Sequence, residues 1–201
     1  DWESADKLIE RLVSHAAKHF LGPYHAVGLG LRGELLIRRG EPRPGVELLR
    51  QGGGTLRDTR HTILSSVFAA ALAEGLVQLR QYEEALRSIE AAIVRREAAG
   101  PSFDSPEMLR VKGLVLASSA RPAEAESCFL ESLALARSQG ALGWELRTAL
   151  TLGQLWRDQG DAGKARALVA PLYARYEEGL DSKDLASARV LLHGWQGDTF
   201  R

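Results

Sequence analysis

A period of 40 residues runs through the chain and limits what it can fold into. Four five-residue segments begin 40 residues apart, and each ends in Gly or Ala: Leu29–Gly33, Ala69–Ala73, Leu109–Gly113 and Ala149–Gly153. A second set of small residues keeps the same spacing: Gly45, Ala85, Ala125 and Ala165. So does a set of bulky apolar residues: Leu49, Ile89, Phe129 and Val169. A constant period of this kind predicts stacked, similar units.

The order of small and bulky residues indicates pairs of antiparallel helices. Two helices approach closely only where each contributes a small side chain, and a bulky side chain one turn later fills the space beside the crossing. This skeleton is typical of the tetratricopeptide repeat. We therefore predict an all-α fold: a right-handed superhelix, or α-solenoid, of tetratricopeptide-like helical hairpins, with about 40 residues per repeat and about ten helices.

Glycine and proline positions support this division. Glycine adopts the left-handed cap conformation without a Cβ penalty, and four glycines stand where helices should end: Gly40, Gly140, Gly160 and Gly179. Four prolines stand near expected helix starts, where the missing N–H is not needed: Pro42, Pro44, Pro106 and Pro122. Ser105 and Asp161 are candidate N-caps. The predicted helices span residues 4–20, 24–39, 44–57, 61–79, 82–98, 106–118, 122–138, 143–159, 162–178 and 183–194.

The register continues to the N-terminus, where Ala5 and Ile9 fall on the small and bulky positions. We expect one solenoid over residues 1–201 that begins with the second helix of a truncated unit, cut from a longer protein. The exposed apolar face of that helix would then have had a neighbour. The predicted parts are the half unit 1–20, the repeats 21–59, 60–99, 100–140 and 141–180, a capping helix 181–194 and a tail 195–201.

Two places break the pattern. Gly52, Gly53 and Gly54 occupy helical positions, and each glycine in a helix costs roughly 1 kcal/mol relative to alanine. We predict a weak or interrupted helix there. Pro171 lies inside the predicted helix 162–178 and removes the hydrogen bond to the carbonyl of Ala167, which predicts a kink.

The charge balance excludes some classes of partner. Lys plus Arg and Asp plus Glu both number 26, so no net positive field favours nucleic acid or an anionic membrane. Neither a membrane-spanning run nor a signal peptide is evident. The single cysteine, Cys128, cannot form an internal disulfide, which fits a reducing compartment. We expect a cytoplasmic protein with no direct nucleic-acid or membrane partner.

Several short motifs have a structural and a chemical interpretation. Gly28, Gly30 and Gly33 fit the dinucleotide pattern G-x-G-x-x-G, but Gly33 lies on the helix-crossing register, which favours a small-residue stripe. His15 and His19 could share a helix face as metal ligands, although packed or solvated histidines fit better without a third ligand.

Other reactive or charged groups suggest no chemistry. Cys128 is interpreted as a buried thiol. The charged stretches Arg38–Arg39 and Arg95–Glu97 are interpreted as solvated helix ends whose cations complement the helix dipole. No nucleophile, base and orienting group occur as a set, so we predict no catalytic residues, no metal and no cofactor.

Parts of the C-terminal half resemble the C-terminal helical-repeat region of bacterial STAND-type signalling ATPases. The segments that carry the resemblance are Leu109–Gly113, Gly140–Arg147, Leu155–Gly160 and the run from Ala167 to Leu192. The resemblance covers roughly residues 15–192, and the chain departs from the family pattern at Gly52–Gly54 and at Leu180. It implies a nucleotide-binding switch coupled to a winged-helix DNA-binding domain or to an adenylate or guanylate cyclase, both outside this chain.

In tetratricopeptide superhelices the first helix of each hairpin lines the concave surface. The register therefore predicts a concave binding surface: Glu34, Arg38, Glu74, Gln78, Glu107, Arg110, Arg147, Gln154 and Arg157. Its acidic residues come early and its basic residues late. One hypothesis is that Arg110, Arg147 and Arg157 hold an acidic group of a partner. The alternative is that they pair with Glu107, Glu145 and Asp158.

Three function classes follow. The first is a sensor or regulatory arm, which binds a protein, a peptide or a small-molecule effector and contacts an upstream nucleotide-binding domain of the same protein. The second is a stand-alone scaffold for protein–protein interaction. The third is a direct small-molecule receptor whose pocket uses Trp144, Trp156 and Tyr173, although these aromatic residues also fit helix-packing positions.

Overall fold

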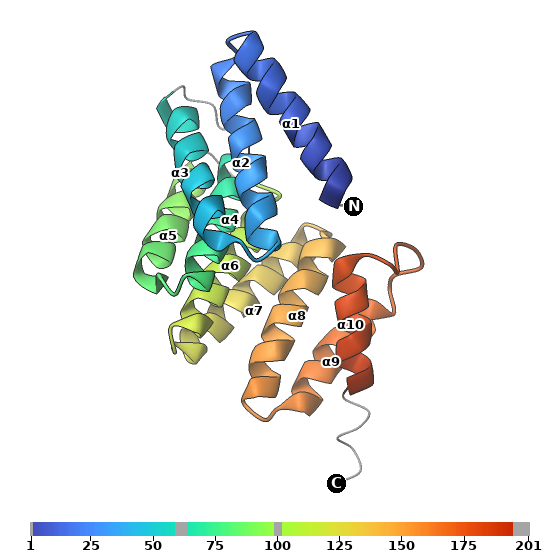
Figure 1. Cartoon of the computed structure of the whole chain (residues 1–201). Helices are drawn as coiled ribbons and strands as arrows, with labels where there is room; N and C mark the ends of the chain where they lie inside the picture. The colour runs from blue at the N-terminus through green and yellow to red at the C-terminus, as the bar shows by residue number, and fades with distance from the viewer. Residues whose placement is uncertain (1, 59–63, 99–101, 195–201) are drawn as a thin grey trace. The chain divides into compact units, whose positions relative to one another are not determined.

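The computed structural model describes residues 2–58, 64–98 and 102–194. Within these residues every regular element is an α-helix, and ten helices follow one another along the chain (Figure 1). Their bounds are α1 (Trp2–Lys18), α2 (Gly22–Arg38), α3 (Pro42–Asp58), α4 (Ser65–Gln78), α5 (Tyr82–Ala98), α6 (Ser105–Ser118), α7 (Pro122–Ser138), α8 (Leu142–Asp158), α9 (Ala162–Tyr173) and α10 (Lys183–Gly194). The predicted all-α solenoid of helical hairpins is confirmed.

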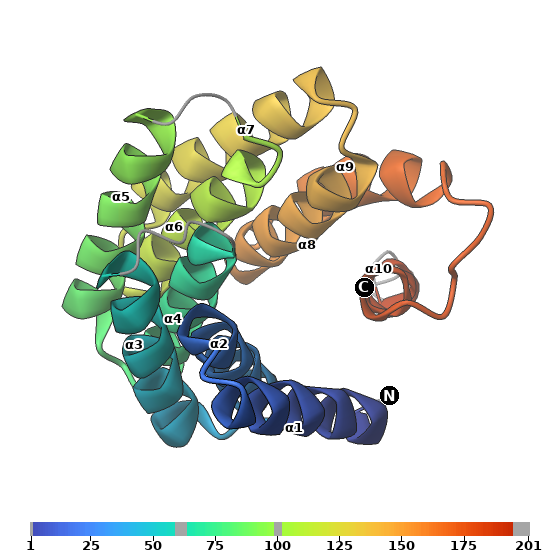
Figure 2. The ribbon, with the colours of Figure 1, turned by 90° about the horizontal axis from the view of Figure 1, so that it is seen from above.

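The chain divides into two compact units, Asp1–Gly100 and Pro101–Arg201, which we call the N-unit and the C-unit. In the N-unit α2 packs against α3 and α4 against α5, and α1 covers α2. In the C-unit α6 packs against α7 and α8 against α9, and α10 lies beside α8 and α9 (Figure 2). Within each unit the first helices of successive hairpins also touch, α2 with α4 and α6 with α8.

Each hairpin closes at the small residues of the register. All eight of these residues are buried, and the four bulky residues beside them are at most 2% exposed. A Cβ on Gly33 would lie 2.7 Å from the carbonyl oxygen of Gly45, so α2 and α3 can cross here only because both residues are glycine. Gly28, Gly30 and Gly33 are therefore buried packing positions in the middle of α2, and the dinucleotide interpretation is wrong for this helix.

The turn inside each hairpin uses the left-handed backbone conformation at the same point of the repeat. Gly40 and Gly160 have φ of 85° and 93°, and Arg80 and Ala120 each have φ of 60°. The predicted left-handed caps at Gly40 and Gly160 are confirmed. Arg80 and Ala120 adopt the same conformation at the steric cost that a Cβ imposes there.

The triple glycine does not interrupt its helix, so the predicted interruption is wrong, whereas a locally weak helix stays a prediction. α3 runs without a break from Pro42 to Asp58. A Cβ on Gly52 would lie 2.7 Å from the carbonyl oxygen of Ala26, so glycine at this position lets α3 approach the backbone of α2. Tertiary packing here outweighs the low helix propensity of the segment.

The predicted kink at Pro171 is a helix end instead. α9 stops at Tyr173, whereas the prediction continued to residue 178. Pro171 lies in the last turn, and after Tyr173 the chain makes single turns in which the N–H of Tyr176 bonds the carbonyl of Tyr173. Gly179 has a left-handed φ of 67° beyond this point and therefore does not cap α9 directly.

Both predicted N-caps need correction. Ser105 is the first residue of α6, and Asp104 holds the N-cap position. Asp161 does stand at the N-cap of α9, but its side chain makes no capping hydrogen bond. The predicted helix start at residues 61–63 and the tail 195–201 lie outside the described residues.

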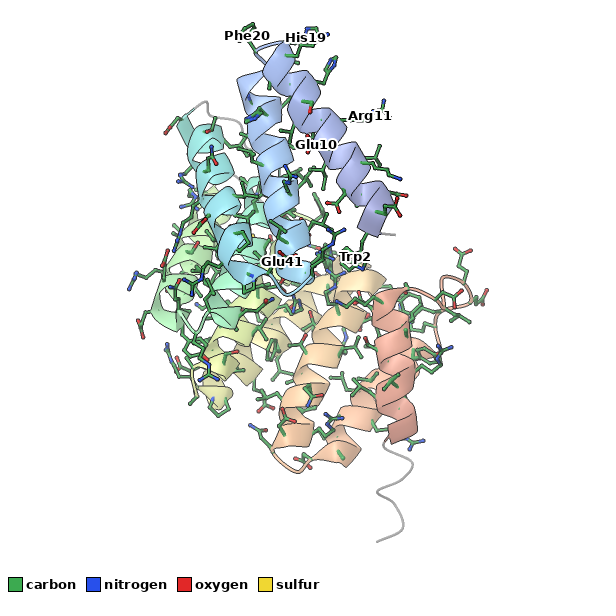
Figure 3. All side chains as sticks on the ribbon, in the orientation of Figure 1. Trp2, Glu10, Arg11, His19, Phe20 and Glu41 are labelled. Atoms are coloured by element: carbon green, nitrogen blue, oxygen red, sulfur yellow. The ribbon has the colours of Figure 1, made fainter. Side chains whose placement is uncertain are left out.

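Apolar side chains in and just after helix α1 are exposed. Leu8 is 63% exposed, and Phe20, just past the end of the helix, is 93% exposed and points away from the neighbouring helices (Figure 3). Ala5 and Ile9, on the register positions, are half-buried.

Candidate functional site

All nine predicted surface residues lie on first helices of hairpins. In the N-unit they come from α2 and α4, and in the C-unit from α6 and α8. We call each of these sets the first-helix surface of its unit. Because α2 touches α4 and α6 touches α8, each surface is formed by two neighbouring helices.

The N-unit surface is largely occupied by local contacts. Glu34 and Arg38, one helical turn apart on α2, form an ion pair of 2.6 Å. Gln78 Nε2 on α4 donates to the carbonyl of Ile37 on α2 at 3.4 Å, which joins the two helices. Glu74 is half-buried and also makes a polar contact. The acidic and basic groups of α2 therefore neutralise each other.

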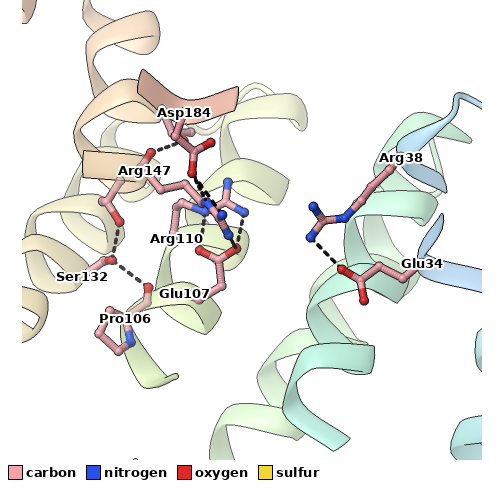
Figure 4. A network of polar contacts seen from close by, with 10 residues as sticks. Glu34, Arg38, Pro106, Glu107, Arg110, Ser132, Arg147 and Asp184 are labelled. Atoms are coloured by element: carbon pink, nitrogen blue, oxygen red, sulfur yellow. Dashed lines mark hydrogen bonds and ion pairs between the residues drawn. The ribbon is translucent and has the colours of Figure 1, made fainter. Parts of the chain in front are cut away.

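The C-unit surface holds a cluster of two arginines and two carboxylates, which we call the Glu107 cluster (Figure 4). Arg110 donates two hydrogen bonds to the carboxylate of Glu107, from Nε at 2.7 Å and from Nη2 at 2.8 Å. Arg147 Nη1 reaches the same carboxylate at 3.2 Å, and its Nη2 lies 3.0 Å from Oδ2 of Asp184 on α10. The cluster joins α6, α8 and α10, and its formal charges cancel.

Burial and charge act in opposite directions on the titration of this cluster. Burial raises the pKa of Glu107, but the hydrogen bonds and positive charges of Arg110 and Arg147 outweigh it, so the pKa lies below its ordinary value. Burial lowers the pKa of Arg147, and the carboxylates of Glu107 and Asp184 more than reverse that effect. Glu107 and Arg147 therefore stabilise each other's charged form.

A buried hydroxyl pair lies beneath the cluster. Ser132 on α7 donates to the carbonyl of Pro106 on α6 at 2.7 Å, and its Oγ lies 2.8 Å from Oγ1 of Thr148 on α8. Both residues are fully buried. This contact fixes the position of α6, which carries Glu107, against the next hairpin.

The three arginines that could hold an acidic group of a partner have different surroundings. Arg110 pairs with Glu107, as the alternative interpretation expected. Arg147 pairs with Glu107 and Asp184, and Glu145 instead takes Arg137 at 2.6 Å. Arg157 is exposed, and its neighbour Asp158 accepts a hydrogen bond from Gln154 at 2.6 Å.

Sequence reasoning missed Asp184. The sequence did contain a signal for it. The 40-residue spacing between Glu107 and Arg147 continues to residue 187, and Asp184 lies one helical turn before that position. Extending the register into the capping helix would have placed Asp184 beside Arg147.

Of the aromatic residues expected to form a pocket, Trp156 packs between helices. Trp156 is 6% exposed, and its Nε1–H donates to Glu126 on α7 at 2.9 Å. A hydrogen bond from Lys164 lowers the pKa of that carboxyl. Arg147 covers the ring of Trp144 at 5.0 Å from the ring centroid. Trp156 therefore matches the helix-packing interpretation, whereas Trp144 is half-buried and contacts an arginine of its own helix.

The remaining sequence candidates have simple surroundings. The rings of His15 and His19 lie against each other with centroids 4.4 Å apart, and both residues are exposed. Within the described ranges no three His, Cys, Asp or Glu side chains gather in a way that could hold a metal ion. Cys128 is half-buried on α7, so its interpretation as a buried thiol is wrong in degree.

The N-unit also contains a cavity of about 370 Å³ between α3, α4 and α5. Its apolar wall includes Leu49, Leu56 and Phe68, each at most 3% exposed. Three arginines from the last turns of α3 and α5 line it: Arg57, Arg95 and Arg96. The register does not predict this cavity, although Gly53 on its wall belongs to the glycine run that the sequence marked as unusual.

Comparisons with known proteins support the fold alone. No protein-family model and no curated protein matches the chain. Among solved structures, the crystal structure of BtubC (BKLC) from P. vanneervenii is similar, with a TM-score of 0.70 and 16% sequence identity. The match covers 98% of this chain and 83% of BtubC. At this identity the likeness extends to the helical architecture.

None of the helices in the described segments is long and apolar enough to cross a membrane.

Proposed function

We propose that this chain is a non-catalytic binding module that serves as the sensor or regulatory arm of a larger bacterial signal-transduction ATPase. The observation that carries the proposal is the arrangement of first helices, which brings polar side chains of successive hairpins side by side in each unit. Helical-repeat proteins use such continuous surfaces to bind partners. The sequence resemblance to the repeat region of STAND-type ATPases supports the regulatory context.

In this proposal a protein, a peptide or a small-molecule effector binds the module and shifts the equilibrium of an upstream nucleotide-binding domain in the cytoplasm. A ligand can shift such an equilibrium only by its difference in affinity between the two states. The exposed charges of the first-helix surfaces, Arg38 and Arg157, are the groups best placed to contact the partner domain, because neither is buried by its own unit.

The complete open reading frame provides the first test. The proposal expects a phosphate-binding loop upstream of residue 1, and a reading frame without one would contradict the ATPase context and favour a scaffold. ATP hydrolysis by the full-length protein provides the second test. Replacing Arg38 and Arg157 by Glu is expected to change the basal or effector-stimulated rate, whereas Arg43→Glu and Arg166→Glu, on the second helices α3 and α9, should leave it unchanged.

The cavity of the N-unit favours a second candidate, a direct small-molecule receptor. A volume of about 370 Å³ lies within the range of natural ligand pockets. This receptor would use a site different from the aromatic pocket expected from the sequence.

A further inference from the structure

We infer that the cavity between α3, α4 and α5 is a binding site for a small organic anion that carries an apolar tail or ring. This inference goes beyond the proposed function, because it names a site and a ligand class and holds whether or not an ATPase is attached. Four observations support it: the composition of the wall, the charge at the rim, a buried unsatisfied nitrogen, and a helix that keeps space open.

The wall suits an apolar group. Leu49 and Leu56 of α3 and Phe68 of α4 are almost completely shielded from solvent, yet their side chains border an unfilled space. Leu72 of α4 continues this wall and is half-buried. An apolar group that enters the space gains the contacts that these side chains lack on that side.

The rim suits a negative charge. Arg57 comes from the end of α3, and Arg95 and Arg96 come from the end of α5. Among the residues described, no carboxylate lines the cavity and none lies within ion-pairing distance of these three guanidinium groups. Arginine forks bind carboxylate and phosphate oxygens with two parallel hydrogen bonds.

Arg96 is interpreted from the sequence as part of a solvated helix end, but the surroundings of its side chain differ from that interpretation. Its Nε atom is buried and has no hydrogen-bond partner in the described part of the protein. A buried N–H without an acceptor is destabilising, and buried polar groups are normally satisfied. A ligand oxygen in the cavity would supply the acceptor.

The first turn of α4 adds a second favourable element. Ser65 and Ser66 line the cavity at the N-terminus of this helix, where the helix dipole favours an anion. Ser88 of α5 contributes a further hydroxyl from the opposite wall. The lining of the cavity thus combines hydroxyl groups from α4 and α5 with apolar side chains.

Gly53 keeps the space open. This residue lines the cavity, and a Cβ there would lie 3.4 Å from Nη1 of Arg57. Its neighbour Gly54 is also half-buried but does not line the cavity, and a Cβ on it would meet nothing closer than 3.9 Å. A pair of leucine substitutions at these two positions therefore separates filling of the cavity from the general effect of leucine in this helix.

The test uses isothermal titration calorimetry of this chain with four probes: octanoate, octyl phosphate, 1-octanol and acetate. We expect saturable binding of octanoate or octyl phosphate, at least tenfold weaker binding of 1-octanol, and no measurable binding of acetate. Equal affinities for octanoate and 1-octanol would contradict the selection of a negative charge. Binding of acetate as tight as that of octanoate would contradict the role of the apolar wall.

Variants locate the site. Gly53→Leu should abolish binding while Gly54→Leu leaves it unchanged. Arg96→Gln should weaken octanoate binding about tenfold or more, as expected for the loss of a hydrogen bond to a charged group, whereas Arg87→Gln on the exposed side of α5 should not. Circular dichroism melting of each variant confirms folding. Binding that is insensitive to both Gly53→Leu and Arg96→Gln, in folded proteins, would overturn the site.

Discussion

In the C-unit the buried cations face carboxylates, whereas in the N-unit three arginines face a cavity. Arg110 and Arg147 share the carboxylates of Glu107 and Asp184 across three helices. In the N-unit, Arg96 instead has a buried nitrogen without an acceptor among the described residues. The same repeat skeleton thus supports one unit with an internally paired charge cluster and one that is suited to an added ligand.

This difference explains why the predicted charged surface and the cavity have different roles. The Glu107 cluster stabilises the packing of α6, α8 and α10, and a partner that took Arg147 would first have to break two ion pairs. A ligand that binds the cavity would not have to break these ion pairs. A charged residue that the repeat pattern exposes is therefore a weaker indication of binding than one whose partner is missing.

The largest expected effect compares the interiors of the two units at one register position. Leu72 and Leu152 are equivalent in the repeat, but Leu152 is fully buried and Leu72 borders the cavity. Leu152→Ala should lower the free energy of unfolding by about 3–5 kcal/mol, and Leu72→Ala by about half as much or less, because fewer contacts are lost. Urea denaturation measures both. Equal losses would contradict the difference in packing.

The second prediction tests the Glu107 cluster. Glu107→Ala leaves the guanidinium of Arg110, whose side chain is 7% exposed, without its main carboxylate. We expect a loss of about 2–3 kcal/mol in the free energy of unfolding, somewhat below the range for fully buried pairs. Glu83→Ala, at an exposed position on α5, is the control and should change stability by less than about 0.5 kcal/mol. A similar small change for Glu107→Ala would show that the cluster does not stabilise the C-unit.

The third prediction concerns acid. The pKa of Glu107 in the folded protein lies below its ordinary value of 4.5, so its contribution to stability is complete above that pH and is lost as the pH falls through the folded pKa. The difference in free energy of unfolding between the wild-type protein and Glu107→Gln should therefore shrink when the pH falls from about 7 to about 3.5. Chemical denaturation at both pH values measures it, and a constant difference would contradict the pKa shift.

The smallest expected effect concerns the hairpin turns. Ala120 in the C-unit and Arg80 in the N-unit adopt a φ of 60°, which glycine adopts without a steric cost. Ala120→Gly and Arg80→Gly should each raise the free energy of unfolding by about 0.5–1 kcal/mol. Ala123→Gly, in the first turn of α7, should lower it, because glycine has the lower helix propensity. If the turn variants were destabilised as Ala123→Gly is, the left-handed turn would be wrong.

The sequence was sufficient to predict the structural features that recur from one repeat to the next. The small and bulky residues fixed the hairpins, and the predicted bounds of α5 and α7 match the structure to the residue. These bounds depend on periodicity and on local punctuation, both of which can be read from neighbouring residues. The left-handed turns at Arg80 and Ala120 follow from the same register, because the repeat places them where glycine stands in the other units.

Features that depend on several helices at once could not be predicted. The continuity of α3 through Gly52 depends on its close approach to Ala26 in α2, which outweighs the local helix propensity. The cavity likewise depends on how Gly53, Leu72 and Arg96 of three helices come together, and no spacing in the sequence encodes that arrangement. Position along the repeat predicted the helix on which each residue lies more reliably than its burial or its partners, since Arg110 was expected on the surface and is buried.

The most direct test of the account is an NMR titration of this chain with octanoate. Because the N-unit holds the cavity and the arginines of the Glu107 cluster are already paired, chemical shift changes should be concentrated in α3, α4 and α5, at residues such as Leu56, Phe68 and Arg96. Glu107, Arg110 and Arg147 should not shift. Saturable changes centred on the Glu107 cluster, or none in either unit, would contradict the account.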